Sequence, residues 1–120
     1  MEGNYKYDKR EVLLNGQGSI LVEDKMNNGY MWKDVTFKAD GKETYIGSYY
    51  TFNYIYSREG MDFNNDYIAI LNYFNEGDEE ETRVDKLFDI KNRSFVEGTQ
   101  EDLLNIYNES FKGYSRTRKN

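Results

Sequence analysis

Apolar and polar residues alternate along much of the chain, in short runs that turn signals separate. The clearest example joins residues 35–39 to residues 42–56 through Asp40-Gly41, a dipeptide that favours a type I′ hairpin between alternating runs. The second run carries apolar side chains on both faces, so it predicts a central strand, or a strand whose outer face is covered or used. Strict alternation places Ile46, Tyr50, Phe52, Tyr54 and Tyr56 on one face, and Tyr45, Tyr49, Thr51 and Ile55 on the other.

Two earlier turn signals extend the same pattern toward the N-terminus. Asn-Gly-Gln-Gly at residues 15–18 separates the apolar runs 12–14 and 19–23. Asn-Asn-Gly at residues 27–29 then precedes another run at 30–39. Asparagine and glycine accept the positive φ angles of tight hairpins, so both segments predict antiparallel neighbours.

The second half of the chain begins with a polar turn signal at residues 57–60. Residues 67–74 then form a continuous apolar run, whose length and aromatic content favour a buried strand, while its periodicity alone also allows a helical turn. Residues 84–90 and 94–96 flank Lys-Asn-Arg at 91–93 and predict a last hairpin.

One helix is predicted, close to the C-terminus. Thr99 is a suitable N-cap, and Glu101 and Asp102 in the first turn complement the helix dipole. Gly113 is placed to end the helix. Its apolar residues recur at helical spacing and form one stripe: Leu103, Leu104, Tyr107 and Phe111.

Together these elements predict an α+β fold, rich in strands. We expect six to seven antiparallel strands in a meander or a curved half-barrel, with one amphipathic C-terminal helix packed on the sheet. The 120 residues fit a single domain, residues 1–120. Residues 112–120 carry four basic and no acidic side chains. They predict a solvated basic tail, and the alternative prediction is that this tail binds nucleic acid.

Composition excludes several classes of chemistry. The chain has no cysteine and no histidine, so it has no disulfide, no thiolate nucleophile and no histidine base or histidine metal ligand. The first residues contain no apolar segment typical of a secretory signal, and no apolar run approaches the roughly 20 residues of a membrane helix. We therefore expect a soluble, cytoplasmic protein that is not an enzyme and needs no cofactor.

Asp62, Asn64 and Asp66 have the spacing with which a calcium-binding EF-hand loop begins. That loop requires glycine at its sixth position and a bidentate glutamate at its twelfth, where this chain has Tyr67 and Tyr73. We expect a polar turn before a strand, and no metal site.

Gly16 and Gly18 form a G-x-G, but a dinucleotide fingerprint requires a third glycine at position 21, where the chain has leucine. A hairpin turn accounts for both glycines.

Glu23 and Lys25, with the upstream Asp8, outline the carboxylate-lysine motif of metal-dependent nucleases. That fold also requires helices around its sheet, and none are predicted here. We interpret the three residues as a charged strand end.

Charge is distributed very unevenly. The chain has 22 acids and 16 bases, and residues 59–82 contain eight of the acids and no base, so the rest carries 14 acids and 16 bases. Within this segment five carboxylates fall in six residues: Glu76, Asp78, Glu79, Glu80 and Glu81. At about 3.3 Å per extended residue that is one carboxylate per roughly 4 Å, close to the about 3.4 Å between phosphates along one DNA strand.

The acidic segment has two interpretations. It is a solvated loop that keeps the protein soluble and discourages pairing at a sheet edge. Alternatively, it is a surface that attracts a basic, nucleic-acid-handling protein such as an effector or nuclease, with Tyr67 and Tyr73 as apolar anchors beside the acids. The basic tail apart, the sign of this charge argues against direct binding to nucleic acid, and without a long apolar run we expect no membrane partner.

In size and composition the chain resembles small phage-encoded inhibitors of bacterial defence, such as anti-CRISPR proteins, which are short and acidic and have no catalytic signature. The resemblance implies a non-enzymatic inhibitor that a phage or mobile element encodes. A toxin-immunity protein has the same general character. The alternative from another class is a β-barrel-like protein that holds a small apolar ligand between residues 45–56 and the C-terminal helix. The third alternative is an enzyme that uses carboxylate, lysine or tyrosine chemistry.

Overall fold

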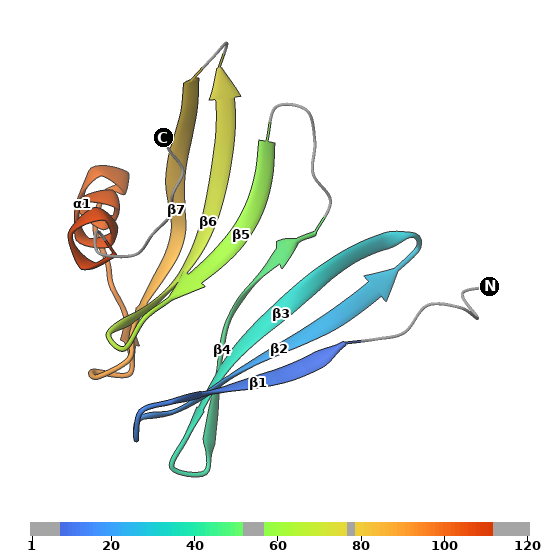
Figure 1. The fold of residues 1–120 in the computed structure, drawn as a ribbon, viewed down its shortest axis with the longest axis vertical. Helices are drawn as coiled ribbons and strands as arrows, with labels where there is room; N and C mark the ends of the chain where they lie inside the picture. Colours follow the sequence, from blue (N-terminus) through green and yellow to red (C-terminus); the bar gives the residue numbers. More distant parts are fainter. Residues whose placement is uncertain (1–7, 52–56, 77–78, 112–120) are drawn as a thin grey trace.

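A computed structural model describes residues 8–51, 57–76 and 79–111 (Figure 1). Within these ranges the chain forms eight strands and one helix. The elements are β1 (Lys9–Leu14), β2 (Gly18–Asn27), β3 (Tyr30–Ala39), β4 (Lys42–Tyr50), β5 (Ser57–Phe63), β6 (Tyr67–Glu76), β7 (Glu79–Asp89), β8 (Ser94–Phe95) and α1 (Gln100–Ser110).

The strands form two antiparallel sheets, each with its strands in sequence order. Sheet 1 contains β1 to β4, and sheet 2 contains β5 to β8. The α+β class, the antiparallel sheets and the C-terminal helix are as predicted. The prediction of one meander of six to seven strands was wrong, because the chain leaves the first sheet after β4 and starts a second one.

The predicted hairpin turns are present, with the backbone angles that their residues favour. Asp40 and Gly41 have φ of 54° and 75°, and Asn28 and Gly29 have φ of 51° and 85°. Positive φ at both central residues is the type I′ requirement. The local sequence therefore determines these two connections.

Strand β5 was not predicted, because Ser57 to Gly60 was interpreted as a turn. This strand has charged residues and a glycine where a predicted strand would have β-branched ones. Pairing with β6 holds it, from Ser57 opposite Phe74 to Phe63 opposite Ile68. A neighbouring strand has overridden a weak local preference.

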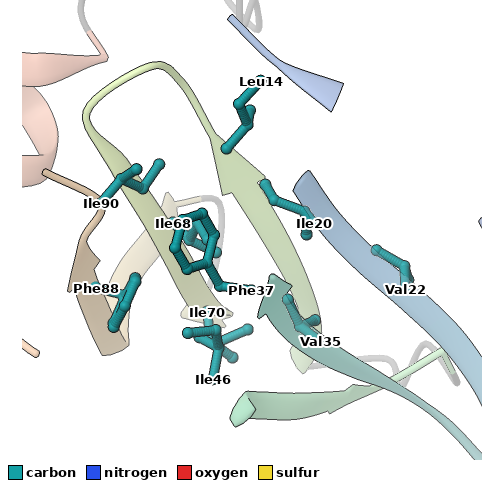
Figure 2. Packing of buried hydrophobic residues seen from close by; sticks show 10 residues of the cluster. All are labelled: Leu14, Ile20, Val22, Val35, Phe37, Ile46, Ile68, Ile70, Phe88 and Ile90. Atoms are coloured by element: carbon teal, nitrogen blue, oxygen red, sulfur yellow. The ribbon is translucent and has the colours of Figure 1, made fainter. Parts of the chain in front are cut away.

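The two sheets pack face to face through a core of ten buried residues (Figure 2). Sheet 1 contributes Leu14, Ile20, Val22, Val35, Phe37 and Ile46, and sheet 2 with the turn after β7 contributes Ile68, Ile70, Phe88 and Ile90. The rings of Phe37 and Phe88 meet with their centroids 5.5 Å apart. Burial of these side chains from water holds the two sheets together.

A second core lies between sheet 2 and α1, and it explains the continuous apolar run of β6. Ile68 and Ile70 face sheet 1, whereas Ala69 and Leu71 pack toward the helix. Both faces of the strand are therefore buried, and the prediction of a buried strand at 67–74 is confirmed for residues 68–71. The helix contributes the buried side chains Leu103 and Tyr107, and its C-cap contributes Phe111.

The helix begins as predicted. The Thr99 hydroxyl accepts a hydrogen bond from the Asp102 backbone N–H, and the Asp102 carboxylate accepts one from the Thr99 N–H, both at 3.1 Å. This reciprocal capping box satisfies two donors of the first turn. The helix ends at Ser110 with Phe111 as its C-cap, before Gly113, which lies with the predicted tail 112–120 outside the described residues.

A β-bulge changes the predicted faces of β4. Val35 pairs with Gly47 and Thr36 with Tyr45, so Ile46 is an extra residue. Ile46 is buried in the core while Tyr50 is exposed on the outer face, although strict alternation placed the two together. Strand β4 is also an edge strand, not a central one. The rest of the predicted strand, residues 52–56, lies outside the described residues.

Candidate functional site

The part of the acidic segment that holds five carboxylates, residues 76–81, spans the end of β6, the turn of the β6–β7 hairpin and the start of β7 (Figure 1). The backbone register places Glu76 opposite Glu79, Asn75 opposite Glu80 and Phe74 opposite Glu81. Asp78 lies outside the described residues, and so do the side chains of Glu76, Glu79 and Glu80. Their predicted role in binding stays a prediction.

Glu81 is exposed, and its carboxylate lies 4.0 Å from the Arg83 guanidinium. The same guanidinium lies 5.1 Å from the centre of the Phe74 ring, and Phe74 is the residue opposite Glu81 in the register. An exposed pair of this length contributes little to stability, so Glu81 remains accessible to an outside cation.

The two predicted tyrosine anchors lie at opposite ends of β6. Tyr73 pairs with Thr82 close to the acidic turn, and the Arg58 guanidinium lies 4.0 Å from the centre of its ring. Tyr67 pairs with Asp89 at the far end, about 20 Å away at roughly 3.3 Å per residue. Only Tyr73 therefore lies near the acids.

The side chains of the calcium-like spacing have other roles. Asn64 is buried, and its Oδ1 accepts hydrogen bonds from the backbone N–H groups of Asp66 (2.8 Å) and Tyr67 (2.7 Å). Asp62 accepts a 2.5 Å hydrogen bond from the Tyr107 hydroxyl, and Asp66 lies 3.3 Å from the Lys91 ammonium. This is the predicted polar turn before a strand, and it also ties the sheet to the helix.

The nuclease-like residues do not converge on one point. Glu23 forms an ion pair with Lys25 at 3.8 Å, whereas Asp8 forms one with Arg10 at 3.6 Å. The backbone of Asp8 pairs with that of Asp24 instead of Glu23. Across the part of the chain that the structure describes, no three Asp, Glu, His or Cys side chains gather as metal ligands would.

Gly16 and Gly18 belong to the β1–β2 turn, with φ of 71° and 122°, and this confirms the hairpin interpretation of the G-x-G.

One alternative prediction placed a ligand site between residues 45–56 and the helix. For residues 45–51, the part of that segment that the structure describes, this prediction is wrong. Strand β4 belongs to sheet 1, and α1 packs on the opposite side of sheet 2, so a complete sheet and the buried core separate the two. Beside the helix there is a surface hollow of about 380 Å³, lined by Tyr67, Asn105, Ile106, Glu109 and Ser110.

A carboxylate pair lies on the inner side of sheet 2. Partial burial, and then the charge of Glu59, raise the pKa of Asp85, while a hydrogen bond from the Asn72 amide opposes the shift. Glu59 also accepts a 2.8 Å hydrogen bond from the Tyr50 backbone N–H, which links the two sheets. The charged form of Asp85 is therefore less stable in the folded chain than in water.

Replacing Asp85 by asparagine is expected to stabilise the protein slightly at pH 7. An acid whose folded pKa is raised costs stability wherever it is ionised, and this cost disappears as the pH falls through the raised pKa toward the ordinary value of about 3.9. Urea unfolding at pH 7 and at pH 3.5 measures the difference. Equal effects of Asp85→Asn at both pH values would contradict the expectation.

One cluster was missed in the sequence, on the outer face of sheet 1. The side chains of Trp32, Asp34, Tyr45 and Tyr50, which we name the Trp32 patch, come together from β3 and β4. The Asp34 Oδ1 accepts hydrogen bonds from the Trp32 indole N–H (3.1 Å) and the Tyr45 hydroxyl (3.5 Å). The rings of Trp32 and Tyr50 meet edge to face at 6.3 Å. Trp-x-Asp on one strand face was the only local signal, and the bulge in β4 hid its partners.

No helix among the described residues has both the length and the apolar character needed to cross a membrane. Comparisons of the chain with protein-family models, with curated proteins and with solved structures found no match.

Proposed function

We propose that this chain is a non-enzymatic acidic binding protein that inhibits or neutralises a basic, nucleic-acid-handling protein in the cytoplasm. The observation that carries the proposal is the concentration of acidic residues at the β6–β7 turn: five acids fall in residues 76–81, whereas the other 114 residues carry 17 acids and 16 bases. A partner surface that normally binds phosphates is complementary to such a segment.

The backbone register adds support. It pairs Glu76 with Glu79, and like charges at opposite positions of a ladder destabilise a hairpin. A hairpin that keeps a destabilising pair of like charges is expected where those charges serve binding.

The chemistry available to the chain also supports a binding role. Without histidine or cysteine, proton transfer at neutral pH and nucleophilic catalysis would depend on carboxylate, lysine or tyrosine groups with strongly shifted pKa values. By analogy with the inhibitors that the chain resembles, a phage or mobile element is the proposed source of the gene. The partner proposed is an effector or nuclease of the host.

The proposal is tested by capture from a lysate of the host on the immobilised full chain, followed by salt elution. We expect the retained proteins to be basic and to bind nucleic acid, to elute as NaCl is raised from about 0.05 to 0.5 M, and to be displaced by duplex DNA. Retained proteins that are acidic, or that resist both salt and DNA, would overturn it.

Charge reversal at the hairpin provides the matched comparison. The triple variant Glu79→Lys, Glu80→Lys, Glu81→Lys is expected to weaken binding of the captured partner at least about tenfold. The control reverses the exposed Glu97, Glu101 and Glu109, outside both sheets, to lysine, which brings the net charge from −6 to zero as well. Equal losses in the two variants would show that overall charge, and not the hairpin, determines binding.

A further inference from the structure

The two sheets differ in what covers their outer faces. Helix α1 packs on the outer face of sheet 2, and in the described ranges no helix or strand lies on the outer face of sheet 1 (Figure 1). Large side chains are left exposed there: Leu13 is 81% exposed, Tyr45 57% and Tyr50 43%. Aromatic residues presented to solvent on a sheet face are typical of the anchors of a protein interface.

Asp34 differs from Glu11 and Glu23 of this face in its partners. Glu11 lies 3.7 Å from the Lys38 ammonium and Glu23 lies 3.8 Å from that of Lys25. Among the described residues, Asp34 forms hydrogen bonds with Trp32 and Tyr45 and no ion pair. Its carboxylate keeps its charge available to a cation from outside.

The surroundings of Asp34 favour one kind of cation. Both of its hydrogen bonds reach Oδ1 and come from aromatic side chains, and the Tyr50 ring lies edge to face with Trp32. Glu23 lies opposite Asp34 in the register, but its charge is paired with that of Lys25, so Asp34 is the acid that attracts an outside cation. A guanidinium combines hydrogen bonds to a carboxylate with stacking on aromatic rings, whereas an ammonium acts mainly as a strongly hydrated point charge.

We propose that the Trp32 patch binds an arginine side chain of a basic protein partner. The inference rests on the proposed function, and it adds a second contact, on sheet 1, to the acidic hairpin of sheet 2. In this arrangement the hairpin provides long-range attraction, and the patch provides a specific contact at which arginine is preferred over lysine.

The test uses the full chain with two defined probes, nona-arginine and nona-lysine peptides of equal charge. Trp32 is the only tryptophan in the chain, so its fluorescence and its indole N–H resonance report on the patch alone. We expect a saturable change in both signals, with nona-arginine binding about three- to fivefold more tightly than nona-lysine.

Two isosteric variants separate the patch from the overall charge. Asp34→Asn keeps an oxygen that can accept the two existing hydrogen bonds, while Glu97→Gln removes one exposed charge outside sheet 1. We expect Asp34→Asn to weaken nona-arginine binding at least about fivefold and Glu97→Gln to weaken it less than about twofold. Circular dichroism confirms that both variants fold.

The outcomes distinguish the two proposals. If the two peptides bind equally, if Trp32 does not respond, or if the two variants behave alike, the patch proposal is overturned, while binding through the hairpin can still stand. Absence of binding to either peptide at low salt would overturn both proposals. A stable dimer that buries Trp32 would assign the patch to a second copy of the chain and also overturn it.

Discussion

Replacement of Phe88 by alanine is expected to lower the free energy of unfolding by about 3–5 kcal/mol, the usual cost of emptying a large aromatic site in a core. Phe88 is fully buried, and its ring lies between Phe37 of sheet 1 (5.5 Å) and Phe95 of β8 (5.2 Å). It therefore contributes to the contact between the sheets. Against a total stability of about 5–15 kcal/mol, such a loss can unfold the chain.

Urea denaturation of Phe88→Ala, followed by circular dichroism, measures this loss. The control is Phe95→Ala, an identical chemical change in the same hairpin at a side chain that is 39% exposed. We expect about 1 kcal/mol for the control, because water already reaches that ring. A loss below about 1 kcal/mol for Phe88→Ala would mean that the two sheets do not depend on this core.

Replacement of Asn64 by alanine is expected to cost about 3 kcal/mol, which is large for a polar residue. The amide accepts two backbone N–H hydrogen bonds within the β5–β6 turn. It also donates to the backbone oxygen (3.2 Å) and the hydroxyl (2.9 Å) of Ser110 at the end of α1. One side chain thus closes a turn and fastens the helix to sheet 2, and its loss leaves buried polar groups without partners.

Comparison with its neighbour isolates this role. Asn65 is exposed, and its backbone oxygen, not its side chain, accepts the hydrogen bond from the Gln17 amide. Asn65→Ala should therefore cost less than about 0.5 kcal/mol. Asn64→Asp keeps the turn but loses the donor to Ser110, so an intermediate loss is expected. If Asn64→Ala and Asn65→Ala have equal effects, the link to the helix has no energetic importance.

The candidate sites were predictable to different degrees. The acidic hairpin is visible as a run of charge, and its place between two predicted strands follows from the same pattern. The Trp32 patch was not predictable, because Tyr45 joins Asp34 only through the register of β3 with β4 and through the bulge at Ile46. The separation of Tyr67 from the acids, in contrast, follows from the length of β6 alone.

The amino-acid sequence by itself determined the elements that depend on neighbouring residues. Asp40-Gly41 and Asn28-Gly29 adopt the positive φ angles that asparagine, aspartate and glycine tolerate, and Thr99 caps the helix with Asp102. These are short-range preferences, and no distant contact is needed to satisfy them.

Only the tertiary structure decided how these hairpins are assembled. Strand β5 is too polar to be recognised by itself, yet it pairs along its whole length with β6. The division into two sheets follows from burial: β6 has apolar side chains on both faces, so it needs sheet 1 on one side and α1 on the other. The outer face of sheet 1 has no such cover in the described chain, and this leaves Tyr45 and Tyr50 of the Trp32 patch exposed.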